Sequence, residues 1–380
     1  MLLFQLSRNL LIPHGFEPNY TVGFARGLHA NGVRFLVVSD DEISPRLDAI
    51  GITHVNLRGS LDPRRPLRQK LPNLLRYYFR LFSLTFKYRG ATVHFTGLLN
   101  KRILLLEGLI LPSWFRLCAG RYVHTAHNAV PHGREDSAAF RFAYRWIYRF
   151  PHTIVVHTTQ LAKQLESEFG VEHSRISIIS IGLNEEVPEI RLTANESRRK
   201  LELPTRGAIA LFFGKVEPYK GVDVLVEAWS LMKSKDAHLA IVGECSDCSY
   251  ASVIRSILAK SPRVAEMEWR EGFISNTDVA LWLKACDVVV MPYRNIYQSG
   301  VLFLSFRFGV PIVATDVGAL SEFVDAESGV IASSNDPAGI AGALDCFFAA
   351  PAQFSRDNIA RRATKYAWDK QCAKIKHLYS

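Results

Sequence analysis

The sequence predicts an α/β protein built from two doubly wound domains. Short apolar runs rich in β-branched residues alternate with helical patterns through nearly all of the 380 residues. The runs are near-continuously apolar, which is typical of parallel strands that are covered by helices on both faces. One segment without a strand signal, Glu185–Pro204, contains two prolines and interrupts the alternation. We therefore expect two Rossmann-like domains that face a central cleft.

The first half of the chain supplies the elements of one domain, which we assign to residues 1–185. Its first strand is predicted at Leu2–Leu6, within the apolar stretch Met1–Ile12. Further strands are expected at Arg34–Ser39, Thr53–Leu57, Thr92–Phe95, Tyr122–Ala126, Thr153–His157 and Arg175–Ile179. Helical patterns lie between them at Tyr20–Asn31 and Gln160–Phe169.

The second half repeats this scheme over residues 186–354. Its strands are expected at Ala208–Phe213, Leu239–Val242, Glu268–Phe273, Val288–Pro292, Ile312–Thr315 and Val330–Ala332. A helix is predicted over Val222–Ser230, and the last pattern, Ser355–Tyr379, is amphipathic and basic. We expect residues 355–380 to form a helix that packs back across the domain junction.

Composition and charge exclude several classes of protein. No apolar run reaches the roughly 18 residues of a membrane-spanning helix. Six cysteines are too few for a disulfide scaffold, so a reducing cytosol is expected. Cys245 and Cys248 form a CxxC without a second ligand pair nearby, so no metal site is expected.

The net charge of +10 is confined to the first half of the chain. Through Glu185 there are 23 Lys and Arg against 13 Asp and Glu, and beyond it 23 against 23. Residues 51–150 alone carry 17 basic and 4 acidic residues. A nucleic-acid-binding protein would explain this charge, but would leave the loops of the neutral half without a role, so we expect no nucleic-acid partner.

Two loops of the first half follow predicted strands. Ser7–Tyr20 contains Gly15 and Asn19, and its glycine permits close approach of a ligand to the backbone; an ordinary strand–helix turn is the alternative. Thr125–His132 places His127 at the carboxyl end of a strand, where an imidazole can exchange hydrogen bonds near neutral pH. A histidine that is satisfied by backbone groups remains the alternative.

Two loops of the second half have the composition of a diphosphate site. Gly214–Gly221 contains Lys215 and Lys220 between a strand and a helix, although it lacks the Gly-Lys-Ser/Thr ending of a P-loop. Pro292–Gly309 contains Gln298-Ser299-Gly300 at a helix start, which presents backbone amides to an anion. Solvated lysines and a plain helix cap are the alternatives.

These loops resemble those of retaining GT-B glycosyltransferases of the family 4 type. The resemblance covers nearly the whole chain through FFGKVEPYKGVDVLVEAW, IVGE, EGF, ACDVVVMPY, QSGV, FGVPIVATDVGALSEFV and, earlier, VHTAHNAVPH, TIVVHT and RISIISIG. It implies transfer of a sugar from a nucleotide diphosphate sugar, UDP- or GDP-linked, with retention of configuration. The first domain would bind the acceptor and the second the donor, with no metal and no further cofactor.

The resemblance also assigns roles to individual residues. Lys215 and Lys220 would bind the donor diphosphate and stabilise the leaving group. Gly214 and the amides of Gly300 and Val301 would complete the anion site, and Phe273 and Ile274 would border the base.

Two assignments fall in the first half of the chain. His127 would contact the donor sugar near the reaction centre, and the loop of Gly15 and Asn19 would help to close the cleft.

The sequence departs from the family pattern at one place. The family usually has two glutamates eight positions apart around the start of the helix after Gln298-Ser299, and neither position is Glu here. Gln298 is our candidate for the sugar hydroxyls, and Glu322 is a second one. The transition state is expected to be oxocarbenium-like, with charge developing on the departing diphosphate and attack from the same face.

A basic helical pattern at Arg64–Arg89 indicates how the acceptor is reached. The polar positions Arg76, Arg80 and Lys87 are predicted opposite an apolar stripe, Leu67, Leu71, Leu74, Leu75, Tyr78 and Phe82, with Pro72 limiting the helix to its later turns. Together with Arg145 this surface suggests anionic lipid headgroups; a core-packed helix with a basic outer face is the alternative.

The membrane interpretation places the protein on the cytoplasmic face of the inner membrane. The acceptor is then a saccharide, expected to be linked to a polyprenyl diphosphate, as in polysaccharide or glycolipid assembly. Three other functions remain open: a GT-B sugar-nucleotide epimerase, a glycogen-type synthase, and a catalytically inactive protein that binds a nucleotide sugar.

Overall fold

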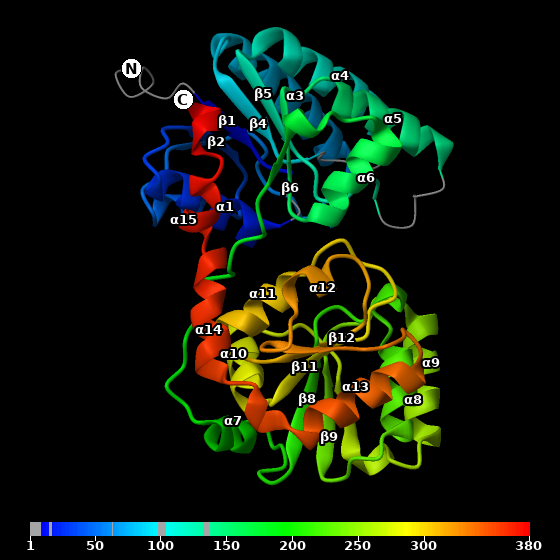
Figure 1. Cartoon of the computed structure of the whole chain (residues 1–380). Helices are drawn as coiled ribbons and strands as arrows, with labels where there is room; N and C mark the ends of the chain where they lie inside the picture. Colours follow the sequence, from blue (N-terminus) through cyan, green and yellow to red (C-terminus); the bar gives the residue numbers. More distant parts are fainter. Residues whose placement is uncertain (1–8, 15–16, 63, 98–103, 132–136) are drawn as a thin grey trace. The chain divides into compact units, whose positions relative to one another are not determined.

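The computed structural model describes residues 9–14, 17–62, 64–97, 104–131 and 137–380. The chain divides into two compact units: Met1–Gly182 with Tyr366–Ser380 form unit 1, and Leu183–Lys365 form unit 2. Each unit has a parallel β-sheet with helices on both of its faces (Figure 1). The predicted α/β class with two Rossmann-like domains is thereby confirmed.

The sheet of unit 1 has the strand order β3-β2-β1-β4-β5-β6-β7. Its strands are β1 (Asn9–Ile12), β2 (Leu36–Ser39), β3 (His54–Asn56), β4 (Thr92–Phe95), β5 (Arg121–Thr125), β6 (Thr153–Val156) and β7 (Ile176–Ile178). The predicted strand Leu2–Leu6 lies outside the described residues. Strand β1 occupies part of the predicted loop Ser7–Tyr20, and that loop boundary is wrong. The polar residues Ser7 and Arg8, which were assigned to the loop after the strand, precede β1 in the sequence.

The helices of unit 1 cover the two faces of this sheet. They are α1 (Pro18–Ala30), α2 (Ser44–Asp48), α3 (Leu67–Lys87), α4 (Leu104–Cys118), α5 (Ala138–Arg149), α6 (Thr159–Phe169) and α15 (Trp368–Ala373). Leu10 and Ile12 of β1 belong to the buried cluster that contains α3 and α4 residues. Leu11, between them, belongs to the cluster that contains α1 and α15 residues. The alternation follows from the two-residue period of a strand.

The end of the chain returns to unit 1 as a short helix. Side-chain atoms on Gly23 of α1 or on Gly182 would overlap the Trp368 ring, at 2.1 Å in each case, so glycine is needed for α15 to pack so closely. The single helix predicted over Ser355–Tyr379 is wrong: α14 (Arg356–Ala363) and α15 are separate helices, and they belong to different units.

Helix α3 differs from its prediction in two respects. It includes Pro72 near its start. Proline has no amide hydrogen to donate to the carbonyl four residues earlier, that of Arg68. Arg68 and Pro72 are exposed, so water can donate to this carbonyl instead. The buried face is formed by Tyr77, Leu81 and Thr85. Only part of the predicted apolar stripe is therefore buried, and its members Leu71 and Leu75 are exposed.

The sheet of unit 2 has the strand order β10-β9-β8-β11-β12-β13. Its strands are β8 (Ala208–Phe213), β9 (Ala237–Val242), β10 (Met267–Arg270), β11 (Val288–Met291), β12 (Ile312–Ala314) and β13 (Gly329–Ile331). Its helices, besides α14, are α7 (Ala194–Lys200), α8 (Val222–Leu231), α9 (Cys248–Lys260), α10 (Asn276–Ala285), α11 (Gly300–Arg307), α12 (Leu320–Phe323) and α13 (Pro337–Ala349).

Candidate functional site

The strand order of unit 2 reverses between β8 and β11, which are neighbours in the sheet. In open parallel sheets, ligands bind beside the carboxyl ends of the strands at such a switch point. The loop after β8 contains Lys215 and Lys220, and the loop after β11 contains Gln298 and Ser299. The two loops predicted to bind a diphosphate therefore start from adjacent strands at the switch point.

Gly214 lies where these two loops meet. Its φ is +120°, and a Cβ atom built on it would lie 3.1 Å from Nζ of Lys220 and 3.8 Å from Cγ2 of Val301. A side chain at this position would occupy the space beside the ammonium group. The structure thus brings together three of the predicted donor-site residues, and it needs glycine at one of them.

Lys220 is a buried cation in this site. Its side chain is only 9 % exposed, and Nζ lies 6.0 Å from the ring centre of Tyr219 and 5.8 Å from that of Tyr293. Burial lowers the pKa of Lys220 to about 8; Glu217 acts against this shift and Lys215 adds to it. No carboxylate in the part of the chain that the structure describes forms an ion pair with Lys220, so this buried ammonium group is prepared to receive an anionic ligand.

The start of α11 adds uncharged hydrogen-bonding groups to the site. Ser299, the residue before the helix, makes no side-chain cap, so the amides of Gly300 and Val301 are not satisfied by that side chain. Oε1 of Gln298 is buried and has no hydrogen-bond partner. Gln298 thus presents an acceptor for a hydroxyl group, as required of a residue that binds a sugar.

An ion pair that the sequence analysis missed connects the two loops. Both terminal nitrogens of Arg294 donate to the carboxylate of Asp223 on α8, at 2.8 and 2.6 Å. Arg294 also donates from Nη1 to the carbonyl of Pro218 and from its amide to that of Tyr219, both at 2.7 Å. No local sequence pattern predicts these contacts, because Arg294 and Asp223 are 71 positions apart.

The remaining predicted donor residues lie on neighbouring loops of unit 2. Phe273 is 89 % exposed, and it lies beyond the end of β10, so the predicted strand Glu268–Phe273 is too long. Ile274 is half-buried and Glu322, on α12, is exposed. No contact joins Phe273, Ile274 or Glu322 to Lys220 among the interactions of the described residues.

Unit 1 has a comparable switch point between β1 and β4. His14 follows β1, and its amide donates to Oγ1 of Thr96, which follows β4, at 3.1 Å. The ring of His127 stacks on the ring of His14 with a centroid distance of 4.7 Å. The rings of Tyr20 and His157 lie 4.8 and 5.2 Å from that of His127. Residues that follow β1, β5 and β6 therefore form one aromatic cluster, and Thr96 after β4 contacts it through a hydrogen bond.

Burial keeps the imidazoles of this cluster neutral. It lowers the pKa of His127 to about 4, against the effect of the Thr96 carbonyl, and that of His157 to about 3. Nδ1 of His157 bonds to the carbonyl of Ile179 at 3.0 Å and is therefore the protonated nitrogen, which leaves Nε2 as an acceptor. The Nε2 atoms of His127 and His157 have no hydrogen-bond partner and could bind uncharged hydroxyl groups.

The other predicted residue of the first loop does not join this cluster. Asn19 is exposed on α1, and its Oδ1 accepts from Nη2 of Arg46 at 2.8 Å. Gly15 lies outside the described residues. His14 and His157 were not predicted as site residues, although His14 lies in the predicted loop Ser7–Tyr20 and His157 is the last residue of the predicted strand Thr153–His157.

The basic surface predicted for unit 1 carries exposed apolar residues as well. Arg76, Arg80 and Lys87 are exposed on α3, as is Arg145 on α5. The apolar side chains exposed on α3 are Leu71 (61 %), Leu75 (64 %), Phe79 (77 %) and Phe86 (54 %). The outer side of α3 is therefore basic and apolar together, rather than purely polar. We call these eight residues the α3–α5 surface.

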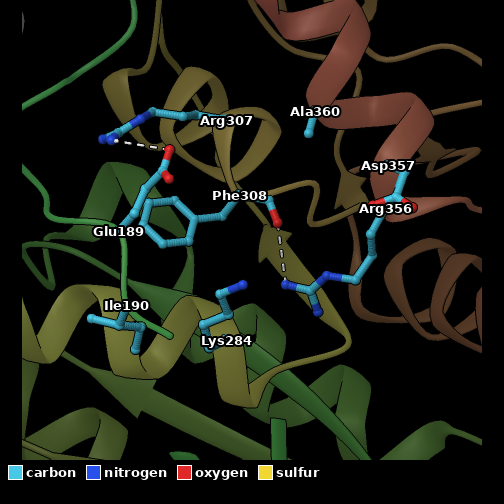
Figure 2. Close-up of a pocket in the computed structure, with 8 residues that line it drawn as sticks. All are labelled: Glu189, Ile190, Lys284, Arg307, Phe308, Arg356, Asp357 and Ala360. Atoms are coloured by element: carbon cyan, nitrogen blue, oxygen red, sulfur yellow. Dashed lines mark hydrogen bonds and ion pairs between the residues drawn. The ribbon is translucent and has the colours of Figure 1, made fainter. Parts of the chain in front are cut away.

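A cavity of about 370 Å³ in unit 2 is lined in part by residues that precede β11 and β12, not by the loops that follow the strands. Its lining includes Lys284, just before β11, and Phe308, before β12, as well as Arg356 of α14 (Figure 2). The guanidinium group of Arg356 donates to the carbonyls of Leu283, Cys286 and Phe308 at 2.7 to 3.3 Å. These carbonyls end α10 and α11, so Arg356 caps two helices, and the cavity is separate from the donor loops.

Among the described residues, no group of three or more His, Cys, Asp or Glu side chains is arranged to hold a metal ion. Of the helices that the structure describes, none combines the length and hydropathy needed to cross a membrane.

Two family models match the chain in succession. Residues 18–187 match the model described as Glycosyltransferase Family 4, and residues 207–349 match the one described as Glycosyl transferases group 1. The first match lies almost wholly in unit 1, and the second lies in unit 2.

Curated relatives of the chain include enzymes named D-inositol 3-phosphate glycosyltransferase. The one from Thermomonospora curvata is 30% identical over 244 residues, which are 60% of this chain and 56% of the relative. The one from Streptosporangium roseum is 28% identical over 279 residues, 68% of this chain and 63% of the relative. The match thus spans less than two thirds of each relative.

Solved structures of similar fold cover nearly the whole chain. Anabaena HepE in complex with UDP and glucose has a TM-score of 0.73 at 14% identity, over 97% of this chain and 98% of that one. Sucrose-phosphate synthase from Thermosynechococcus elongatus has a TM-score of 0.74 at 19% identity, over 98% of each chain. At these identities the similarity shows the fold, which is GT-B.

Proposed function

Because this chain belongs to the family 4 glycosyltransferases of GT-B fold, we propose that it transfers a sugar from a nucleotide diphosphate sugar to a saccharide acceptor. The observation that carries the proposal is the position of Lys220, buried beside Gly214 and Val301 at the switch point of unit 2. An ammonium group and the amides of a helix start form an anion site of the kind that a diphosphate leaving group requires.

The proposed chemistry follows from these groups. As the bond between sugar and diphosphate lengthens, negative charge develops on the diphosphate, and the charges of Lys220 and Lys215 stabilise it more in the transition state than in the ground state. The amides of Gly300 and Val301 act in the same direction. We propose that no metal or other cofactor is needed, and that the acceptor attacks from the face that the diphosphate leaves, with retention of configuration.

Each unit contains acceptor atoms that suit a saccharide. Oε1 of Gln298 in unit 2 has no hydrogen-bond partner and is proposed to accept from a hydroxyl of the donor sugar. The Nε2 atoms of His127 and His157 in unit 1 also have no partner, and they are proposed to accept from saccharide hydroxyls. A neutral His127 suits this role better than a charged one, because an imidazolium has no acceptor nitrogen. Phe273, as an exposed aromatic ring, is proposed to border the base.

A panel of UDP-, GDP- and ADP-linked sugars tests the proposal. A cognate donor should raise the melting temperature, and nucleoside diphosphate should be released when an acceptor is added, with a product whose anomeric configuration NMR shows to be retained. Donor binding without release in any acceptor mixture would favour an inactive sugar-nucleotide-binding protein, which the missing glutamates make the second candidate. Absence of binding to every nucleotide sugar would refute both.

We propose further that the acceptor is lipid-linked and is reached at an anionic membrane surface on the cytoplasmic side. The α3–α5 surface supports this because it combines exposed Leu75 and Phe79 with exposed Arg76 and Arg80. Apolar side chains can enter the headgroup region while neighbouring arginines attract anionic lipids. A purely core-packed helix with a basic outer face would not leave these apolar side chains exposed.

Flotation with liposomes tests the membrane proposal. Wild-type protein should bind vesicles with anionic lipid more strongly than neutral ones, and the double variant Leu75→Ser/Phe79→Ser should lose most of this binding. Leu231→Ser is the matched control, since Leu231 is 57 % exposed in unit 2. Equal binding of wild type and double variant would exclude α3 as the membrane contact.

A further inference from the structure

Arg58 is a buried cation in unit 1 that the proposed mechanism does not use. It follows β3, at the same edge of the sheet as His14, and its side chain is 6 % exposed. Nη2 donates to the carbonyl of Pro13, which follows β1. The guanidinium carbon lies 5.5 Å from the centre of the Tyr77 ring on α3. Nε and Nη1 are buried and have no hydrogen-bond partner.

No carboxylate among the described residues forms an ion pair with Arg58. Asp40, at the end of β2, accepts from the amides of Glu42 and Ile43 at 3.0 and 2.9 Å. Glu107 of α4 accepts from the hydroxyl of Tyr78 at 3.0 Å. The charge of Arg58 is therefore not neutralised by direct contact. A guanidinium group does not lose its proton in proteins, and burying it without a counter-ion is destabilising.

The hydroxyl group of Tyr77 is a third unused donor beside Arg58. Its hydroxyl hydrogen is buried and has no acceptor. Burial raises the pKa of Tyr77, although the charge of Arg58 and a hydrogen bond from its guanidinium group to the phenol act against this. The phenol therefore keeps its proton at neutral pH and can donate. Two guanidinium nitrogens and one hydroxyl are the donor set that binds one phosphate group.

We propose that Arg58 and Tyr77 bind a phosphate group of the acceptor. This inference rests on the proposed function, in which unit 1 receives the acceptor, and it makes that acceptor a phosphate ester or diphosphate rather than a neutral sugar. The donor diphosphate has its own cations in unit 2, Lys215 and Lys220. Tyr77 belongs to the same helix as the exposed Arg76 and Arg80, so a phosphate attracted by α3 would find its buried partner on that helix.

The donors of Arg58 are covered by other side chains, so a phosphate cannot reach them without a local rearrangement. Because Nε and Nη1 of Arg58 have no exposed surface, the phosphate enters only when side chains around them move. The unpaired charge favours such an opening, since the guanidinium gains an ionic partner when the phosphate arrives. Binding of phosphate should therefore raise the stability of unit 1.

The test uses the full chain and inorganic phosphate as the probe. The background is Lys220→Met, which removes the buried cation of the donor site, so that binding to unit 1 dominates. Adding Arg58→Met should weaken phosphate binding at least tenfold in calorimetry, the loss expected when charge-assisted hydrogen bonds are removed. Adding Tyr77→Phe should weaken it less, because one neutral donor is lost.

Arg175→Met is the matched control in the same background. Nη2 of Arg175 donates to the carbonyls of Tyr148 and Pro151 in unit 1, at 2.7 and 2.6 Å, so this arginine is already satisfied. The control should lower the melting temperature and keep phosphate binding, whereas Arg58→Met should keep or raise the melting temperature and lose the binding. If Arg58→Met binds phosphate as the background does, or only destabilises the protein as Arg175→Met does, the inference is wrong.

Two further arms identify the carrier of the phosphate. Glycerol phosphate presents a phosphate monoester in solution, and vesicles containing phosphatidic acid present one on a bilayer. If binding of glycerol phosphate depends on Arg58, the acceptor is a soluble phosphorylated molecule. If only binding of the vesicles depends on Arg58, the acceptor is lipid-linked. If neither binding depends on Arg58, the inference is wrong. Binding of the donor to Arg58→Met in the wild-type background reports on the proposed function separately.

Discussion

At the scale of single residues, Lys220 determines how the reaction responds to pH. Burial lowers its pKa to about 8 in the free protein, and only the protonated amine binds the diphosphate. We therefore expect kcat/KM to fall as the pH rises through about 8, because this parameter reports the free enzyme. The bound diphosphate favours the protonated amine, so kcat should fall only at higher pH.

Lys220→Arg provides the matched comparison for this pH profile. Arginine stays protonated across the accessible range, so the variant should show no decrease of kcat/KM near pH 8, whatever its maximal rate. Profiles should be measured between pH 6 and about 10 with the cognate donor. An unchanged decrease near pH 8 in Lys220→Arg would assign that decrease to another group.

Burial of the charged Lys220 should also lower the free energy of unfolding of the protein. The unfolded chain binds a proton to Lys220 more tightly than the native protein does, so stability rises with pH between the native pKa of about 8 and the ordinary lysine pKa of 10.5. Lys220→Met removes the buried charge and should raise the free energy of unfolding by about 1 to 3 kcal/mol at pH 7. The gain should shrink toward pH 10. Urea unfolding at pH 7 and at about pH 10 measures the gain and its decrease. Lys215 is exposed, so Lys215→Met is the control and should change the free energy of unfolding little.

At the scale of elements, the contact of Arg294 with Asp223 positions two loops. It joins the loop after β11 to the start of α8, and Gly221 allows the close approach, because a Cβ there would lie 2.1 Å from the carbonyl of Pro292. Arg294→Ala and Asp223→Ala should each raise the KM for the donor, and the double variant should be no worse than the singles. A coupling energy of about 1 kcal/mol is expected for a partly exposed bidentate pair.

A second ion pair of unit 2 controls for general effects on stability. Arg362 pairs with Glu327 at 2.7 Å, and Arg362→Ala should leave the KM for the donor unchanged. If Arg294→Ala and Asp223→Ala acted additively on KM, the two side chains would not position the loops as a unit.

The donor loops were predictable at this scale because their signals are local. Glycine and lysine directly after a strand pattern place Gly214 and Lys220 at the carboxyl end of β8, whatever the order of the strands. The contact of Arg294 with Asp223 and the cluster of His14, His127 and His157 depend on which strands are neighbours, and a single sequence contains no information on strand order. Periodicity on α3 likewise predicted a stripe, but not which part of that stripe the sheet would cover.

At the scale of the whole molecule, the two units differ in net charge. Unit 1 carries 26 Lys and Arg against 13 Asp and Glu, whereas unit 2 carries 20 against 23. The donor site in unit 2 therefore depends on a few positioned groups, and unit 1 carries the basic surface together with the unpaired Arg58. This division was visible in the sequence, but the exposed apolar residues of α3 and the burial of Arg58 required the structure.

Binding of nucleotides to the whole protein tests the central claim, that Lys220 and the start of α11 form a diphosphate site. Titration calorimetry should compare the nucleoside diphosphate of the cognate base with its monophosphate, in wild type and in Lys220→Met. Wild type should bind the diphosphate at least tenfold more tightly, and the variant should lose most of that preference, as expected when a charge-assisted contact is removed. An undiminished preference for the diphosphate in Lys220→Met would contradict the assignment of the site.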